Sequence, residues 1–186
     1  MVLAGPSGVG KTTLVRELRA RRPDLWWSVS ATNRAPRAGE VDGVDYHFIS
    51  TEEFVRLRDE GGLLEWFDVY GDLKGTPRAP VEEHLRAGDD VLIEVDVQGA
   101  LAIRRALPEA FLVFVRPPSR AVQRERLRSR DPHADPAELE RRLAAAAAEE
   151  AHAPEFDAVV VNDDVDRAVD EILSLLDARA GRAPEP

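Results

Sequence analysis

Cysteine is absent from the 186 residues of this chain, and lysine occurs only at Lys11 and Lys74. Without cysteine the chain can form no disulfide and can use no thiolate as a nucleophile or metal ligand, which fits a reducing compartment. No stretch approaches the roughly 20 apolar residues of a membrane-spanning helix, and the apolar run at the N-terminus is too short for a signal peptide. We therefore expect a soluble, cytoplasmic protein without a membrane partner.

Positive charge is also scarce overall, because 25 lysines and arginines face 35 acids and the net charge is −10. This balance argues against a nucleic-acid partner, which would require a basic surface. The deficit is uneven: residues 1–58 carry nine cations and seven acids, a balance of +2, so the remainder carries −12. Residues 116–130 nevertheless hold six arginines and one glutamate. Local basic clusters in an acidic chain favour small anionic ligands.

Short apolar runs alternate with helical patterns, which is typical of an α/β fold with a parallel sheet covered by helices on both faces. At this length we expect one domain. Residues 31–76 interrupt the alternation with short β-like pieces and one helix, and they read as an insertion. The expected strands cover residues 1–4, 26–30, 91–97, 110–115 and 157–162. The expected helices cover residues 11–21, 51–60, 77–87, 98–106, 119–130, 136–151 and 164–179.

Three helix ends carry their own signals in the sequence. Ser50 and Glu53 have the spacing of a capping box. Asp135 precedes Pro136, which suits the first helical position. Gly88 follows an expected helix end, where a left-handed residue is favoured.

Residues 5–12, GPSGVGKT, match the phosphate-loop pattern G-x-x-x-x-G-K-[ST] between an apolar strand and a helix. Its glycines allow consecutive N–H groups to face phosphate oxygens at a helix N-terminus. In such loops the lysine reaches the β- and γ-phosphates, and the hydroxyl, here that of Thr12, holds Mg²⁺. The expected ATP-binding residues of this segment are Gly5, Pro6, Ser7, Gly8, Val9, Gly10, Lys11, Thr12 and Thr13.

An ordinary glycine-rich turn is the alternative interpretation of this loop. Its position between strand and helix favours nucleotide binding. The motif does not identify the reaction, because GTPase switches, motor ATPases and small-molecule kinases share it.

Four further stretches resemble the guanylate kinases in order and spacing. They are SVSATNRAPRAGEVDGVDYHF at 28–48, LLEWFDVYGDLKGT at 63–76, IEVDVQGA at 93–100 and VVNDD at 160–164. The resemblance implies a phosphate-loop kinase fold with a five-stranded parallel core sheet, and transfer of the ATP γ-phosphate to GMP, and to dGMP, with Mg²⁺ and no covalent intermediate. It implies a core at 1–30, 77–118 and 152–180, a small mixed GMP-binding insertion at 31–76, a helical lid at about 119–151 and a tail at 181–186.

The resemblance also assigns a GMP site. Guanidinium groups bind phosphate in a bidentate manner, and a carboxylate can accept the adjacent N1 and N2 hydrogens of guanine. A salt-bridged surface loop is the alternative for residues 34–46, and the part played by Asp42 and Asp45 stays open between ligand contact and structure. The GMP-binding residues implied are Ser30, Arg34, Arg37, Glu40, Tyr46, Glu65, Lys74, Thr76 and Asp96.

Arg130 and Arg142 match the pair that contacts ATP phosphates in this family, and Arg126 lies one helical turn before Arg130 on the same face. With Lys11 they form the expected catalytic set. Ion pairing with nearby glutamates is the alternative for each arginine. Asn162 and Asp163 match the segment that borders the adenine of ATP.

The chain departs from the family pattern at two places in the GMP site. Lys74 stands where a tyrosine is usual, and Asn33 replaces a usual threonine. Lys74 could give the GMP phosphate a stronger, more salt-sensitive contact, or it could point into solvent.

Two other functions stay open at this stage. Guanylate-kinase-like domains of scaffolding proteins bind peptides in place of GMP, although they typically have a degraded phosphate loop, whereas this one is intact. A phosphate-loop kinase for a different acceptor is the third possibility, and the pairing of Glu65 with Asp96 argues against it.

Overall fold

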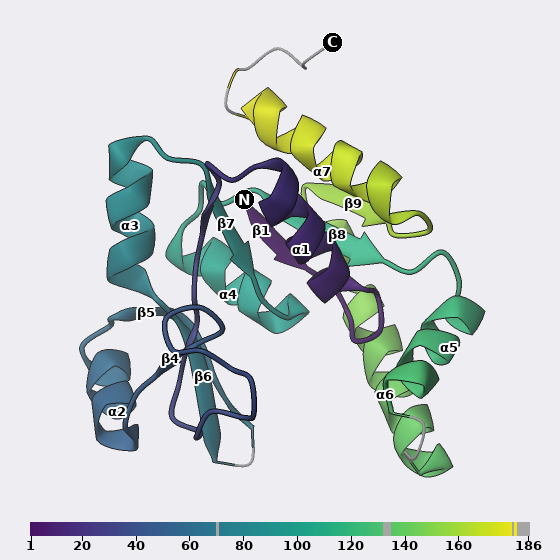
Figure 1. The fold of residues 1–186 in the computed structure, drawn as a ribbon, viewed down its shortest axis with the longest axis horizontal. Helices are drawn as coiled ribbons and strands as arrows, with labels where there is room; N and C mark the ends of the chain where they lie inside the picture. The colour runs from purple at the N-terminus through teal and green to yellow at the C-terminus, as the bar shows by residue number, and fades with distance from the viewer. Residues whose placement is uncertain (70, 132–134, 180, 182–186) are drawn as a thin grey trace. The chain divides into compact units, whose positions relative to one another are not determined.

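The computed structural model describes residues 1–69, 71–131, 135–179 and 181 (Figure 1). The strands are β1 (Val2–Ala4), β2 (Trp26–Trp27), β3 (Ala31–Thr32), β4 (His47–Phe48), β5 (Leu63–Val69), β6 (Asp72–Pro77), β7 (Val91–Glu94), β8 (Leu112–Arg116) and β9 (Ala158–Val161). The helices are α1 (Lys11–Arg21), α2 (Thr51–Asp59), α3 (Arg78–Ala87), α4 (Val97–Ala106), α5 (Arg120–Arg130), α6 (Pro136–Glu150), the 3₁₀ turn η1 (Ala153–Glu155) and α7 (Val165–Arg179).

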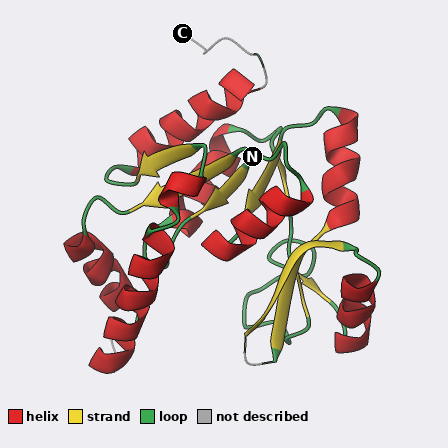
Figure 2. Cartoon of the chain, turned by 180° about the vertical axis from the view of Figure 1, so that it is seen from behind, coloured by secondary structure: helices red, strands yellow, loops and turns green. Residues whose placement is uncertain are grey.

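The strands form two sheets. The larger has the order β2-β7-β1-β8-β9, and its pairs β2/β7, β1/β8 and β8/β9 run parallel (Figure 2). The smaller has the order β4-β3-β6-β5 and is mixed, because β3 pairs parallel with β4 and antiparallel with β6. The expected α/β fold with a five-stranded parallel sheet is therefore confirmed.

The chain divides into two compact units, which are described separately. Unit 1 comprises Met1–Asp24, Glu94–Ala100 and Phe111–Pro186, and unit 2 comprises Leu25–Ile93 and Leu101–Ala110.

The interior of unit 1 is built from strand residues and the apolar faces of the helices. Leu3, Leu14 and Phe114 are fully buried. Phe114 packs edge-to-face on Phe156, with ring centroids 5.1 Å apart. The apolar runs of the sequence thus become buried strands, as parallel sheets covered on both faces require.

Helix α7 lies alongside α1 within unit 1 (Figure 1). Two consecutive arginines at the C-terminal end of α1 bind acids of α7. Arg21 donates to Asp166 and Asp170, and Arg22 donates to Asp177 at 2.8 Å. Cations at a helix C-terminus also interact favourably with the helix dipole. Ion pairs with α7 and this dipole effect therefore both stabilise the C-terminal end of α1.

Unit 2 contains a small core of its own. Phe54 of α2 is fully buried and packs with Ala31, Leu63 and Leu73 of the smaller sheet. The β5/β6 hairpin is antiparallel and pairs Glu65 with Thr76.

The helix-end signals of the sequence are confirmed. Ser50 accepts a hydrogen bond from the Glu53 amide at 3.1 Å, and Asp135 accepts one from Ala137 at 3.0 Å. Gly88 ends α3 with φ of 85°, a conformation that glycine adopts without steric cost.

Two expected strands end early. The strand expected at 26–30 stops at Trp27, because the chain leaves the larger sheet there and enters the smaller one at Ala31. The strand expected at 91–97 stops at Glu94, since α4 begins at Val97. The expected tail at 181–186 falls, apart from Gly181, outside the described residues. No helix in the described part of the chain is long and apolar enough to cross a membrane.

Candidate active site

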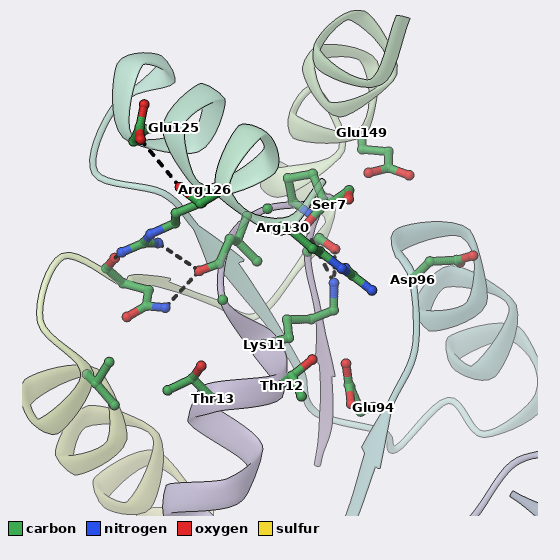
Figure 3. Close-up of a pocket in the computed structure, with 18 residues that line it drawn as sticks. Ser7, Lys11, Thr12, Thr13, Glu94, Asp96, Glu125, Arg126, Arg130 and Glu149 are labelled. Carbon is green, nitrogen blue, oxygen red and sulfur yellow. Dashed lines mark hydrogen bonds between the residues drawn. The ribbon is translucent and has the colours of Figure 1, made fainter. Parts of the chain in front are cut away.

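A pocket of about 830 Å³ opens within unit 1 around the glycine-rich loop (Figure 3). The loop, the ends of β7 and β9, and helices α5 and α6 contribute side chains to its wall. The lining residues are Gly5, Pro6, Ser7, Gly8, Val9, Gly10, Lys11, Thr12, Thr13, Glu94, Asp96, Glu125, Arg126, Ser129, Arg130, Glu149, Asn162 and Val165.

The loop passes directly into a helix. Gly10 is the N-cap of α1 with φ of 91°, and its carbonyl accepts from the amides of Thr13 and Leu14 at 3.1 and 3.2 Å. Gly8 has φ of 81°, so two positions of the loop use the left-handed region that favours glycine. The first N–H groups of α1 have no carbonyl partners within the helix, and this end of the helix is favourable for an anion.

Two cations converge in the pocket. The Lys11 ammonium donates to the carbonyl of Gly5 at 2.5 Å and reaches that of Pro6 at 3.5 Å. Figure 3 shows the guanidinium of Arg130 next to the Lys11 amine. Like charges side by side repel each other unless an anion lies between them, which makes this part of the pocket suited to phosphate.

The side chains of Asn162 and Arg126 both donate hydrogen bonds to one backbone carbonyl of the loop. The Val9 carbonyl accepts from Asn162 Nδ2 at 2.7 Å and from Arg126 Nη1 at 3.0 Å, while Arg126 Nη2 donates to the Asn162 carbonyl at 3.0 Å (Figure 3). Asn162 is 1% exposed, and its Oδ1 has no hydrogen-bond partner within the described part of the chain. A buried acceptor without a donor costs about 1–3 kcal/mol, so this oxygen is a candidate ligand contact.

Four acids also line the pocket, and Glu125, one of them, accepts from the Ser129 hydroxyl at 3.3 Å. Glu94 ends β7, and Figure 3 shows its carboxylate beside Thr12. Asp96 Oδ1 accepts from the Gly99 amide at 2.7 Å and so caps α4. Burial raises the pKa of Glu149, and the charge of Asp96 raises it further, whereas Lys11 lowers it.

Two expected ATP-site residues do not line this pocket. Arg142 donates to Glu138 Oε1 at 2.9 Å on the same helix. Asp163 accepts from Arg167, and this interaction lowers the pKa of the Asp163 carboxyl. The Arg142 pair is the one that the charge-pairing alternative for the arginines anticipated. The pairing of Asp163 with Arg167 was not expected from the sequence.

In unit 2 the structure gathers most of the expected phosphate clamp. Arg34 makes a bidentate pair with Glu40, both distances being 2.7 Å, and the Arg37 amide donates to Glu40 at 2.7 Å. The hydrogen bonds from Arg34, followed by that from the Arg37 amide, hold the pKa of Glu40 at about 2. Arg34 Cζ and Lys74 Nζ each lie 4.9 Å from the ring centroid of Tyr46, whereas the Arg37 side chain is exposed. Glu40 thus neutralises part of a cationic cluster.

The expected guanine contacts of unit 2 lie on its hairpin. Thr76 donates its hydroxyl to Glu65 Oε1 at 2.6 Å, and the exposed fractions of the two residues are 0% and 6%. Ser30 precedes β3 and is half-buried. A buried carboxylate held by a hydroxyl is a rigid acceptor. Asp96, the other expected guanine contact, belongs to unit 1.

Three polar residues of unit 2 have structural contacts. Asp42 accepts from the Phe48 amide at 2.9 Å, and Asp45 accepts from Val41 at 2.8 Å, so both support the loop backbone. Asn33 donates to Thr51 and accepts from the Leu73 amide at 2.7 Å. The replacement at Asn33 thus braces the smaller sheet against the start of α2.

Glu94 and Glu149 are pocket residues that sequence reasoning missed. Glu94 carried a detectable signal, because an acid at the carboxyl end of a buried strand next to a phosphate loop is where Mg²⁺-binding acids occur. Glu149 carried none, since it follows a run of alanines in a helix and resembles a surface residue.

The comparisons with known proteins agree with this geometry. The family model described as guanylate kinase matches residues 1–179. The guanylate kinase of Rhodococcus jostii (strain RHA1) is 54% identical over 96% of this chain and 87% of its own length, and that of Mycobacterium sp. (strain MCS) is 50% identical over 100% and 94%. The crystal structure of guanylate kinase from Anaplasma phagocytophilum has a TM-score of 0.76 and 33% identity over 98% of this chain and 86% of that one.

Proposed function

The chain belongs to the guanylate kinase family and is an ATP:GMP phosphotransferase, and we propose that the pocket of unit 1 is its ATP site. The observation that carries the proposal is the convergence of Lys11, Arg130 and the N-terminus of α1 in one pocket. The loop amides and both cations bind the triphosphate. The buried Asn162 Oδ1 accepts from the 6-amino group of adenine, which supplies the donor that this oxygen lacks, and Asp163 borders the base.

Catalysis in this site consists of positioning and charge stabilisation. The phosphate of GMP is already ionised, so no general base is needed when its oxygen attacks the γ-phosphorus in line. Lys11 and Arg130 stabilise the charge on the transferred phosphoryl group. Arg142 joins them by exchanging its contact with Glu138 for a phosphate oxygen.

Mg²⁺ accompanies ATP in this proposal, held by Thr12 and Glu94. Hydroxyl and carboxylate oxygens suit Mg²⁺, which commonly binds one or two carboxylates together with substrate phosphates. No group of three or more His, Cys, Asp or Glu that could hold a metal occurs among the described residues. We assign the other coordination positions to ATP phosphate oxygens and water. When bound, the ion neutralises phosphate charge.

We expect Glu94→Gln to raise the Mg²⁺ concentration for half-maximal rate by roughly tenfold or more, the usual effect of removing a group that supports a bound metal. The measurement is initial rate against free Mg²⁺. Glu125→Gln is the matched control, because Glu125 lines the same pocket but accepts from Ser129. Equal Mg²⁺ dependence in Glu94→Gln and the parent would remove Glu94 from the metal site.

GMP binds through residues of unit 2, and the family resemblance adds Asp96 of unit 1 to its contacts. Arg34, Arg37 and Tyr46 hold its phosphate, and Glu40 keeps Arg34 oriented before the nucleotide arrives. Glu65 and Asp96 accept the guanine N–H groups, with the hydroxyls of Thr76 and Ser30 alongside. The pairing of Glu65 with Thr76 supports this assignment, since the carboxylate is already held in place.

We assign Lys74 to the phosphate of GMP, together with Arg34, Arg37 and Tyr46. Its position over Tyr46, which is also under Arg34, supports a third cationic contact. We expect Lys74→Met to raise KM for GMP about two- to fivefold at low salt, the range for an exposed pair worth up to about 1 kcal/mol. The effect should shrink at high salt, KM for ATP should stay unchanged, and Lys74→Tyr should recover much of the loss.

Arg86→Met is the control for this charge change, because Arg86 is exposed on α3. Unchanged GMP binding by Lys74→Met at low ionic strength would make Lys74 a bystander.

The organisation that goes with this function is a core at 1–30, 77–118 and 152–180, a GMP-binding insertion at 31–76 and a lid at about 119–151. We place the enzyme in the cytoplasm, and we include dGMP as an acceptor because none of the proposed contacts requires the ribose 2′-hydroxyl.

The test is ADP release from ATP with GMP, dGMP, AMP, CMP and UMP as acceptors. Turnover with GMP and dGMP, and little with the others, supports the proposed acceptor site. Equal turnover with AMP would contradict the assignment of Glu65 and Asp96.

A further inference from the structure

Helix α5 contains a buried glutamine, Gln123, that does not line the pocket proposed as the ATP site. Gln123 is 2% exposed, and its Nε2 donates to the carbonyl of Ser7 in the phosphate loop at 2.9 Å. It lies one turn inside α5, whose first turn is capped by Ser119. Burying an amide costs free energy unless it is hydrogen-bonded. The hydrogen bond to Ser7 therefore offsets part of the cost of burying the Gln123 side chain.

Arg126 makes the corresponding contact three residues later. Its guanidinium bridges the carbonyl of Val9 in the loop and that of Asn162 after β9, each at 3.0 Å. Residues three apart on a helix share a face. The face of α5 that carries Gln123 and Arg126 therefore binds alternate carbonyls of the loop, those of Ser7 and Val9.

Apolar packing fixes the same face against the loop. A Cβ atom at Gly8 would meet Leu127 Cγ at 2.8 Å, and one at Gly10 would meet Asn162 Nδ2 at 2.6 Å. Leu127 is itself buried. The loop therefore has no room for a side chain at either glycine, and α5 cannot leave it without breaking two hydrogen bonds and this contact.

We propose that Gln123 and Arg126 are positioning residues that set the orientation of the phosphate-loop peptides before ATP binds. In a planar trans peptide the C=O of one residue and the N–H of the next point in opposite directions. Holding the Ser7 and Val9 carbonyls toward α5 turns the amides of Gly8 and Gly10 away from it, which leaves them available to phosphate oxygens. The inference rests on the proposed role of residues 5–12 in binding ATP.

This assignment changes the role expected for Arg126. Arg126 lines the pocket as Arg130 does. Both terminal nitrogens of the Arg126 guanidinium donate to backbone carbonyls, however, so we assign its effect on ATP to the loop. The part of α5 from Gln123 to Leu127, which falls in the proposed lid at about 119–151, is then held against the loop before ATP binds.

The experiment replaces Gln123 with leucine, which has a similar volume but no donor, and with methionine, which keeps the unbranched shape. Isothermal titration measures the affinity for MgATP, for inorganic tripolyphosphate and for GMP. We expect both variants to bind MgATP and tripolyphosphate about tenfold more weakly, equivalent to about 1.4 kcal/mol, with GMP affinity unchanged. In ¹H–¹⁵N spectra of the nucleotide-free protein, the Gly8 amide should shift more than that of Gly39, a glycine remote from α5 in the chain.

Arg128→Leu is the matched control, because Arg128 is exposed on the same helix. Parental affinity for tripolyphosphate in both Gln123 variants would overturn the proposal, and so would equal losses for tripolyphosphate and GMP, which would indicate general destabilisation. Lys11→Met, measured in parallel, distinguishes a failure of the proposed ATP site from a failure of the positioning role of Gln123. If that variant also binds tripolyphosphate normally, the proposed ATP site itself is wrong; if only the Gln123 variants do, the site stands and the positioning role fails.

Discussion

Lys11→Met should lower kcat by about 100- to 1000-fold, the range for removing one preorganised group that stabilises transition-state charge. Methionine retains the length of the side chain and removes only the ammonium, which belongs to the first residue of α1. Because this charge acts mainly on the transferring phosphoryl group, KM for GMP should change little. Steady-state kinetics with saturating GMP measures the effect.

Lys11→Met requires a control for correct folding, because Lys11 also contacts the loop backbone. The ammonium also donates to the carbonyls of Gly5 and Pro6, so its loss could loosen the loop. Circular dichroism and thermal melting of Lys11→Met should match those of Arg16→Ala, an exposed position on the same helix. A folded Lys11→Met that retained near-parental turnover would exclude residues 5–12 as the catalytic phosphate loop.

Glu65→Gln should raise KM for GMP by about 5- to 150-fold, corresponding to about 1–3 kcal/mol for a stranded buried hydrogen-bonding group. Glu65 is only 6% exposed and already accepts from Thr76 Oγ1 at 2.6 Å. A glutamine that keeps this contact through its oxygen turns its NH₂ toward the guanine N–H groups, so two donors face each other. KM for ATP should not change.

A comparison of GMP with IMP as phosphate acceptors tests the same contact of Glu65. IMP lacks the 2-amino group of GMP, so the parent enzyme should prefer GMP, and Glu65→Gln should narrow the difference. Glu83→Gln, an exposed position on α3, removes a charge without touching the hairpin. If Glu65→Gln keeps the parental preference for GMP over IMP, Glu65 does not read the guanine edge.

Local patterns determined much of what was predicted correctly. The glycine-rich loop at residues 5–12 is a continuous segment that leads into a helix through short-range geometry, and α1 begins at Lys11 as expected. The caps at Ser50, Asp135 and Gly88 depend on neighbours within a few residues. The alternation of apolar runs and helical patterns was sufficient for the parallel sheet, because each strand buried on both faces needs covering helices.

Strands β3 to β6 and helix α2 fall at residues 31–77, close to the segment that the sequence set apart, but the contacts within this segment were not predicted. The sequence placed Arg34, Glu40 and Tyr46 in one loop, and the structure pairs Arg34 with Glu40. Charge spacing alone could not distinguish that pair from one with Asp42 or Asp45. The turn geometry decided it, because those two acids accept from loop amides instead.

The sequence by itself determined the fold class, the position of the glycine-rich loop before α1 and, through the resemblance, the reaction. Only the tertiary structure decided that Glu94 lies beside Thr12, that Arg142 is paired with Glu138, and that Gln123 holds the loop. The Gln123–Ser7 and Asn162–Val9 hydrogen bonds join positions 116 and 153 residues apart. Propensity and periodicity act over a few residues, whereas such contacts exist only once packing has brought distant segments together.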